Sequence, residues 1–181
     1  LKGGLHGGAN IKVIEMMNNI KDNVKNWGDE NEVDSYLDKM LNKQAFDKTG
    51  KIYGIGHAIY TLSDPRCVLL KEQARQLAKE KGREDEYNLY ASIEKLAPKA
   101  FYRFKGANSK TIAANVDFYS GFVYQCLDIP EELYTPIFAI ARVPGWAAHR
   151  IEEVTSTSAR IIRPAYKNVC ERHPYRPLSQ R

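Results

Sequence analysis

The chain has 181 residues, of which 43% are apolar and 10% aromatic, and its 27 Lys and Arg against 22 Asp and Glu give a net charge of +5. A chain of this length and composition can bury a hydrophobic core. Its lysines alternate with acids, as in residues 79–86, which indicates solvated helix faces and argues against a nucleic-acid patch. No stretch reaches the ~18 apolar residues that a membrane span needs. We therefore expect neither a nucleic acid nor a membrane as partner.

The cysteines indicate a reducing compartment. Cys67, Cys126 and Cys170 are odd in number, lie far apart and form no CxxC pair, which argues against disulfides and against a zinc or other metal site. Together with the absence of a signal-peptide pattern, this predicts a cytoplasmic protein, with the mitochondrial matrix as the alternative. The chain opens on Leu1 with neither Met nor a leading helix, so we expect a piece of a longer protein.

Apolar residues recur at helical spacing along most of the chain. The first periodic segment runs from Val13 to Trp27 and the second from Val33 to Leu41. A third helix is predicted from Asp64-Pro65 to Gly82, because Asp is a good N-cap, Pro suits the first helical position and Gly ends helices. Its buried face would consist of Cys67, Leu70, Ala74, Leu77 and Ala78.

The second half of the chain is also predicted to be helical. Residues 84–97 should form a helix that ends before Pro98, and residues 111–127 a central helix buried on all sides. A further apolar helix is expected from Glu131 to Arg150, bent or broken at residues 143–145. Only residues near 52–53 and 161–162 could form short strands, so the predicted fold class is all-α. The tail, residues 171–181, lacks an apolar period and would be loose or wrapped over a partner.

Three side chains stand out as candidates for acid–base chemistry. Asp117 is a carboxylate inside the nearly charge-free apolar run 115–124, so it is either a functional group or the buried partner of an arginine. His6 precedes glycines and a helix start, where backbone N–H groups favour a neutral imidazole that can donate to a carbonyl oxygen; a capping or turn histidine is the alternative. His57 follows the glycines of residues 54–56, which let a ligand approach the backbone, and a simple turn is the alternative.

Two arginines are unusually placed. Arg66 would stand in the first turn of its helix, where the macrodipole repels a cation, so a nearby anion would explain its position. Arg142 lies in the apolar residues 137–143 and suits bidentate carboxylate binding, with an ion pair to Glu152 as the alternative. Together, one carboxylate, two imidazoles and several guanidiniums predict proton abstraction next to an anionic substrate.

Ordered motifs carry a family resemblance. They are LHGGAN at residues 5–10, GHAIY and SDPR between residues 56 and 66, NVDFYSG at 115–121, ARVPGWAAH at 141–149 and RIIRP at 160–164. In this order they resemble the successive signatures of citrate synthase, over residues 1 to about 165. The resemblance implies an all-α enzyme with a large and a small domain, of which this chain is the carboxyl-terminal part. Residues 1–8 would end a large-domain segment, 9–122 would form the small domain, and 123–181 would be the carboxyl-terminal part of the large domain and the tail.

The resemblance also implies a reaction, the condensation of acetyl-CoA with oxaloacetate and hydrolysis of the citryl thioester to citrate and CoA in the tricarboxylic acid cycle. Asp117 would remove the methyl proton while His6 hydrogen-bonds the thioester oxygen. His57 would polarise the oxaloacetate carbonyl. Coenzyme A thioester enters as a substrate, and no tightly bound cofactor is expected.

Binding residues are implied in the same way. Arg66 and Arg142 match arginines that hold substrate carboxylates, and Arg163 matches one that reaches the site of a partner subunit, so a homodimer or higher homo-oligomer is expected. A loop whose backbone cradles coenzyme A is matched by Ile52, Gly54, Ile55 and Gly56.

The chain departs from the family pattern at three points. Thr61 stands where some members have an arginine for a coenzyme A phosphate, and a hydroxyl cannot replace that charge. Ala165 stands where many relatives have a basic residue. A further oxaloacetate-binding histidine of the family would lie upstream of His6, so the 181-residue piece alone is expected to be inactive.

Three functional interpretations remain open from sequence. The first is the condensing enzyme, either for acetyl-CoA or, as a 2-methylcitrate synthase, for propionyl-CoA, since one methylene changes discrimination by only about 1–3 kcal/mol. The second is a non-catalytic module that binds coenzyme A through residues 52–57. The third is a structural dimerisation domain in which Asp117 and the arginines are buried ion pairs.

Overall fold

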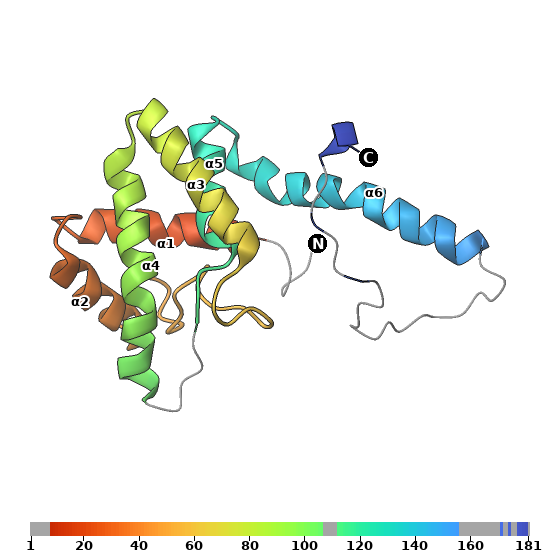
Figure 1. The fold of residues 1–181 in the computed structure, drawn as a ribbon. Coiled ribbons are helices and arrows are strands. Elements are labelled where there is room, and N and C mark those ends of the chain that lie inside the picture. Colours follow the sequence, from red (N-terminus) through yellow and green to blue (C-terminus); the bar gives the residue numbers. More distant parts are fainter. Residues whose placement is uncertain (1–7, 107–111, 156–170, 172–173, 175–176, 181) are drawn as a thin grey trace. The chain divides into compact units, whose positions relative to one another are not determined.

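The computed structural model describes residues 8–106 and 112–155, together with residues 171, 174 and 177–180. The chain divides into two compact units, residues 1–141 and residues 142–181. The described helices, shown in Figure 1, are α1 (Ala9–Asn23), α2 (Glu30–Leu41), α3 (Pro65–Glu80), α4 (Glu84–Lys105), α5 (Val116–Cys126), α6 (Tyr134–Thr155) and two 3-10 turns, Glu131–Leu133 and Leu178–Gln180. These residues contain no strand, which confirms the predicted all-α class. The predicted domain boundary after residue 122 stays a prediction.

The core of the first unit lies where α5 packs against α1 and α3, while α4 packs against α2 and α3. Its centre is an aromatic cluster in which the ring of Tyr90 lies 5.4 Å from Phe118, 5.9 Å from Tyr119 and 5.1 Å from Phe122, centroid to centroid. Such pairs add about 0.5–1.5 kcal/mol each beyond the burial of their area. All four rings are essentially inaccessible to solvent, so they fix α4 against α5.

A close helix crossing brings α1 and α5 together. Gly121 of α5 lies so near Ile14 of α1 that a Cβ atom at position 121 would stand 2.7 Å from Ile14 Cγ1. Glycine is therefore needed here for space. The crossing also buries the middle of α5, residues 118–123, as predicted for a central helix.

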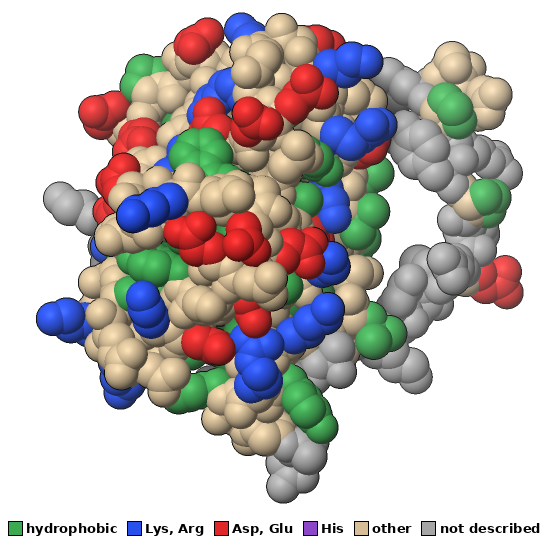
Figure 2. All heavy atoms as spheres, turned by 90° about the vertical axis from the view of Figure 1, so that its left-hand side faces the viewer, with side chains coloured by type: hydrophobic (Ala, Val, Ile, Leu, Met, Phe, Trp, Pro, Cys, Tyr) green, Lys and Arg blue, Asp and Glu red, His purple; other side chains and the backbone are tan. Residues whose placement is uncertain are grey.

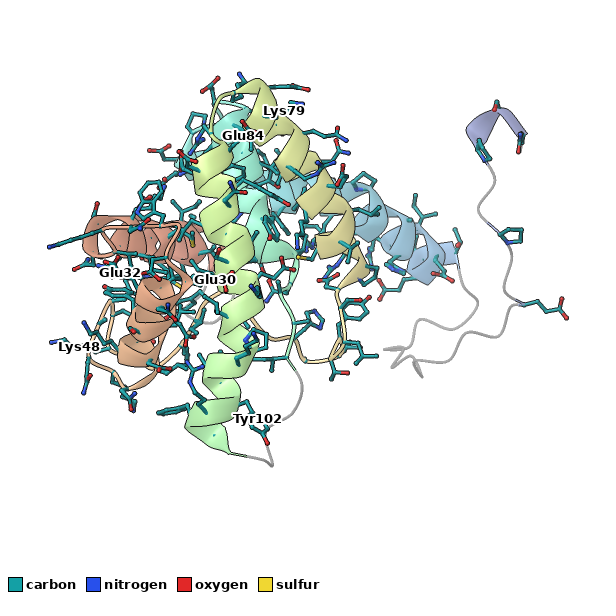
Figure 3. The ribbon with its side chains drawn as sticks, turned by 60° about the vertical axis from the view of Figure 1, so that its left-hand side comes forward. Glu30, Glu32, Lys48, Lys79, Glu84 and Tyr102 are labelled. Atoms are coloured by element: carbon teal, nitrogen blue, oxygen red, sulfur yellow. The ribbon has the colours of Figure 1, made fainter. Side chains whose placement is uncertain are left out.

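Charges are arranged as the alternating sequence pattern predicted. Figure 2 shows positive and negative side chains interspersed over one face of the molecule. Several charged side chains of the described residues form ion pairs, such as Lys95 Nζ with Glu30 Oε1 at 2.6 Å. Figure 3 labels Glu30 and Glu84 near the first turns of α2 and α4, and Lys79 near the last turn of α3. Acids near helix amino ends and bases near carboxyl ends complement the helix dipole.

The predicted ends of α3 are confirmed. Asp64 is the N-cap, Pro65 is the first helical residue and the helix ends at Glu80, two residues before Gly82. Gly82 adopts a positive φ of 65°, the left-handed conformation that terminates many helices. On the predicted inner face, Cys67, Ala74 and Ala78 are buried, and Leu70 and Leu77 are partly buried against the core.

The predicted end of α4 before Pro98 is wrong, because the helix continues to Lys105. An internal proline costs about 3 kcal/mol in an isolated helix. Here the continued helix buries Ala100 and brings the Arg103 guanidinium to 2.8 Å from Asp34 and 2.9 Å from Asp38 of α2. Contacts with α2 therefore offset the local penalty.

Two further helix predictions need correction. The helix α5 begins at Val116, later than predicted, because residues before it are extended and Ala114 forms an antiparallel bridge with Ile55. The helix α6 is not broken at Pro144 and extends to Thr155, since a proline removes one hydrogen bond of the helix and the bonds on either side can persist. The possible strand at residues 52–53 does not form, and that at 161–162 lies outside the described residues.

Candidate functional site

The glycine loop at residues 54–56 is fixed to the segment that leads into α5. The N–H of Asn115 donates to Gly54 O at 2.9 Å and the N–H of Gly56 donates to Ala113 O at 2.8 Å. Asn115 also donates from Nδ2 to Gly56 O at 2.8 Å. His57 follows this tied loop directly, and Asp117 follows Asn115 by two residues, so these bonds bring the two predicted catalytic side chains into one region.

Gly54 is required by the closeness of this contact. Its φ is +78°, and a Cβ atom there would lie 2.9 Å from Phe118 Cα in α5. The loop is also anchored to α1, because the N–H of Tyr53 donates to Met16 Sδ at 3.3 Å. Ile52 beside it is buried, so the predicted coenzyme A loop has a rigid base.

The geometry of His57 defines its tautomer. Its Nδ1 accepts hydrogen bonds from the N–H groups of Ile59 at 3.0 Å and Tyr60 at 3.2 Å. A ring nitrogen that accepts carries no proton, so the imidazole proton lies on Nε2. The ring also packs against that of Tyr60, with 4.8 Å between centroids and an angle of 36° between the ring planes. His57 is solvent-exposed and can present Nε2–H as a donor to a bound molecule.

Asp64 joins the starts of two helices. It is only 1% exposed, and its Oδ1 accepts the N–H of Arg66 in the first turn of α3 at 3.0 Å. Its Oδ2 accepts the N–H of Val116 in the first turn of α5 at 3.2 Å. The hydrogen bonds from the Arg66 side chain lower the pKa of Asp64 to about 2, against the opposing effect of burial.

Arg66 has the anionic neighbour that its position predicted, and that neighbour is Asp64. Its Nε donates to Asp64 Oδ1 at 3.0 Å and its Nη2 donates to Oδ2 at 2.8 Å. The guanidinium lies 5.8 Å over the Tyr60 ring, and 53% of the side chain is exposed. Since a guanidinium is planar with five donors, both Nη1 N–H groups and one Nη2 N–H point away from Asp64.

Asp117 is half-buried in the first turn of α5. Its N–H donates to the N-cap side chain, Asn115 Oδ1, at 2.9 Å. The charge of Asp117 contributes to the raised pKa values of Arg66 and Tyr124. The pKa of Arg66 is raised chiefly by its hydrogen bond to Asp64, with a smaller contribution from Asp117; the pKa of Tyr124 is raised by burial and, to a lesser degree, by Asp117. The carboxylate therefore lies within electrostatic range of the Arg66 guanidinium.

The predicted site residues are divided between the two compact units, and some lie outside the described residues. His57, Arg66, Asp117 and the loop residues Ile52, Gly54, Ile55 and Gly56 belong to the first compact unit. Arg142 is exposed on α6 in the second unit. Glu152, the alternative partner of Arg142, lies 3.6 Å from the imidazole of His149. His6 and Arg163 lie outside the described residues, as do Cys170 and Ala165.

Sequence reasoning treated Asp64 only as a helix cap and missed its wider role. The spacing of Asp64 and Arg66 was the available signal, since an N-cap side chain and the side chain two residues later can meet. The hydrogen bond that Asp64 accepts from Val116 joins residues 52 positions apart, so no local sequence pattern predicts it. Among the described residues, no group of three or more His, Cys, Asp or Glu could hold a metal ion. No helix in the same residues is long and apolar enough to cross a membrane.

Comparison with known proteins identifies the family. Residues 1–165 match the family model of the citrate synthase C-terminal domain. Citrate synthase of Synechocystis sp. is 38% identical over 183 residues, covering 100% of this chain and 41% of that protein. Citrate synthase of Acidithiobacillus ferridurans is 39% identical over 183 residues, covering 100% and 42%. The chain thus spans about two fifths of the length of these curated relatives.

Solved structures give the same relationship. A ternary complex of carboxymethyl coenzyme A and oxaloacetate with citrate synthase from Thermoplasma acidophilum superimposes with a TM-score of 0.64 at 33% identity, covering 100% of this chain and 44% of that one. Citrate synthase from Pyrobaculum aerophilum gives 0.66 at 30% identity, covering 99% and 40%. The described unit is therefore the carboxyl-terminal helical domain of a known class of all-α enzymes. The chain belongs to the citrate synthase family.

Proposed function

We propose that the chain is the carboxyl-terminal part of an enzyme that condenses acetyl-CoA with oxaloacetate and hydrolyses the citryl thioester to citrate and CoA. The observation that supports the proposal is that hydrogen bonds join the segments that carry His57, Arg66 and Asp117. Three hydrogen bonds tie the His57 loop to the start of α5, and Asp64 ties the same helix start to Arg66.

The surroundings of each group suit the role that we propose for it. His57 carries its proton on Nε2 because Nδ1 accepts two N–H groups, so it can donate to the oxaloacetate carbonyl and make its carbon electrophilic. Asp117 stands at the amino end of α5, where the helix dipole favours the ionised form that a general base needs. It would remove the methyl proton of acetyl-CoA, with His6 donating to the thioester oxygen.

Arginines would hold the carboxylates of oxaloacetate. Arg66 keeps one edge of its guanidinium on Asp64, and the Nη1 edge is directed away and suits a substrate carboxylate. We assign the same task to Arg142 and, across a homodimer interface, to Arg163. The related Thermoplasma acidophilum structure is a complex with carboxymethyl coenzyme A and oxaloacetate, which supports acetyl-CoA and oxaloacetate as substrates for the present chain.

The loop at residues 52–56 would cradle coenzyme A. Ile55 faces Ala114 in an antiparallel bridge whose hydrogen bonds are made by the residues on either side, Gly54 and Gly56. In that arrangement the N–H and C=O of Ile55 point to the opposite side of the loop. They supply one donor and one acceptor to a ligand.

We place the enzyme in the cytoplasm, in keeping with the free thiols of Cys67 and Cys126.

The decisive test is D117N in the full-length protein that contains this chain. Losing the base should lower kcat by roughly 10²–10⁴-fold, measured as CoA release with oxaloacetate present. Asp128→Asn is the matched control, because Asp128 follows the opposite end of α5 with its side chain 87% exposed, and it should keep the wild-type rate. Wild-type turnover by D117N would instead support the structural dimerisation interpretation.

Two further measurements separate the remaining alternatives. Rates with acetyl-CoA and propionyl-CoA over oxaloacetate distinguish citrate from 2-methylcitrate synthesis, and we expect the higher kcat/KM with acetyl-CoA. Calorimetry of coenzyme A with the 181-residue chain tests the binding-module interpretation. Binding without turnover in the full-length protein would favour that module over an enzyme.

A further inference from the structure

One buried carboxylate in this region has no assigned part in the reaction. Asp64 is 1% exposed, and its two oxygens accept four hydrogen bonds, from the N–H, Nε and Nη2 of Arg66 and from the N–H of Val116. Burial of a charge is costly unless such bonds compensate it. An N-cap alone requires one of these bonds, so the other three need a separate explanation.

Asp64 controls the direction of Arg66. An arginine side chain has many rotamers, and ordering it costs entropy on ligand binding. Here two parallel bonds to Asp64 fix the guanidinium plane, and the Tyr60 ring lies beneath it at 5.8 Å. That ring in turn packs against the imidazole of His57. The outward edge of Arg66 is therefore set before any substrate arrives.

Asp64 also fixes the start of the helix that carries Asp117. Its Oδ2 accepts the N–H of Val116, the residue directly before Asp117. The same oxygen binds Arg66 Nη2, so one atom defines the spacing between the first turns of α3 and α5. Any displacement of this oxygen would move the proposed base and the proposed carboxylate-binding arginine relative to each other.

We propose that Asp64 is a positioning residue of the condensing site: it preorients Arg66 toward a dicarboxylate substrate and fixes the α5 start from which Asp117 acts. This inference rests on the proposed function. It predicts that Asp64 contributes to oxaloacetate binding through Arg66 without touching the substrate.

The test is a double-mutant cycle in the full-length protein, with D64N, R66A and the double variant. The readout is the dissociation constant of oxaloacetate from calorimetry, with KM and kcat measured in parallel. D64N should weaken oxaloacetate binding about tenfold or more, as expected when a charge-assisted bond is lost. In the R66A background the same substitution should change the oxaloacetate dissociation constant less than about threefold, because Asp64 then has no Arg66 guanidinium to orient.

The control variant separates positioning from helix capping. Asp29 caps α2 as Asp64 caps α3, accepting the N–H of Asn31 at 2.9 Å, but it lies on a helix that does not contribute to the site. D29A removes this capping oxygen, so it should lower thermal stability and leave the oxaloacetate dissociation constant unchanged. If D64N does not fold, D64E carries the test: it keeps the charge, moves it by one methylene, and should weaken binding at least about threefold only when Arg66 is present.

The possible results separate the positioning role of Asp64 from the proposed condensing activity. Equal effects of D64N in the wild-type and R66A backgrounds, or no effect at all, would overturn the positioning role while leaving the enzyme assignment intact. A wild-type protein that binds oxaloacetate without condensing it would refute the proposed reaction, and the binding cycle would still decide the role of Asp64. A wild-type protein that does not bind oxaloacetate would refute both.

Discussion

Gly54→Ala tests whether the close approach of the glycine loop to α5 holds the site together. The residue has a φ of +78°, and its added Cβ would meet Phe118 Cα and Cβ, each at 2.9 Å. Placing a non-glycine residue in the left-handed region costs about 1–2 kcal/mol. Because the obstructing atoms include backbone, the overlap cannot be relieved by a rotamer change and should add about 1–3 kcal/mol.

The sum is a loss of roughly 2–5 kcal/mol in the free energy of unfolding. Gly82→Ala is the matched control, because Gly82 also has a positive φ, +65°, but no atom lies within 4 Å of its added Cβ. This control should cost only the conformational part, about 1–2 kcal/mol. Both variants can be measured by urea unfolding of the 181-residue chain, followed by circular dichroism at the helical band.

The difference between the two losses in free energy of unfolding shows whether the contact of Gly54 with α5 stabilises the fold. We expect Gly54→Ala to be at least about twice as destabilising as Gly82→Ala, and to weaken coenzyme A binding as well. Equal losses for the two variants would show that the loop can move off α5 without penalty, and would refute the argument that this contact fixes His57 beside the start of α5.

Three further predictions concern charges and hydrogen bonds. The pKa of Glu86 is lowered to about 2, first by its hydrogen bond to Arg83, and that of Asp64 to about 2. A carboxyl group whose pKa is lower in the folded than in the unfolded chain stabilises the fold at pH values above its unfolded pKa, and this stabilisation is lost as the pH falls toward the folded pKa. The free energy of unfolding should therefore be flat from pH 7 to about 5 and fall steeply toward pH 2. E86Q should reduce this fall by about 2 kcal/mol in urea titrations, and an unchanged pH profile would contradict the assignment. Asn115→Ala removes both the α5 cap and the bond to Gly56 O and should cost roughly 2 kcal/mol, with Asn115→Ser, which keeps a capping oxygen, costing about half; a neutral Asn115→Ser would mean that the bond to Gly56 contributes nothing. Tyr119→Phe removes the 2.6 Å bond to Glu94 and should lower the free energy of unfolding by about 1–2 kcal/mol, whereas the exposed Tyr102→Phe should be neutral, and a neutral Tyr119→Phe would refute the contribution of that bond.

Sequence rules succeeded where the determining residues are neighbours. The boundaries of α3 follow from Asp64, Pro65 and Gly82, each of which acts within one turn of the helix end. Local rules failed at Pro98, where packing of the continued helix against α2 offset the proline penalty. They also failed at the start of α5, because the residues before it pair with a loop 59 positions earlier.

The membership of the candidate site stays a prediction from sequence, and only some of the contacts between its residues could have been predicted. Motif resemblance singled out His57, Arg66 and Asp117 by residue type and order. The tautomer of His57 could not be predicted, since it depends on how the chain folds back so that Ile59 and Tyr60 donate to Nδ1. The anion beside Arg66 was expected, but its identity as Asp64, and the reach of that carboxylate to α5, required the fold.

The bridge between Ile55 and Ala114 bears on how this region can diverge. The chain between these two anchors carries α3 and α4, and the turn that joins them, residues 81–83, is attached to α5 as well. Arg83 in that turn donates to Gln125 Oε1 at 3.3 Å, near the end of α5. Insertions or deletions there would break this second attachment, so natural variation in length should be rare both in the turn and beside the bridge.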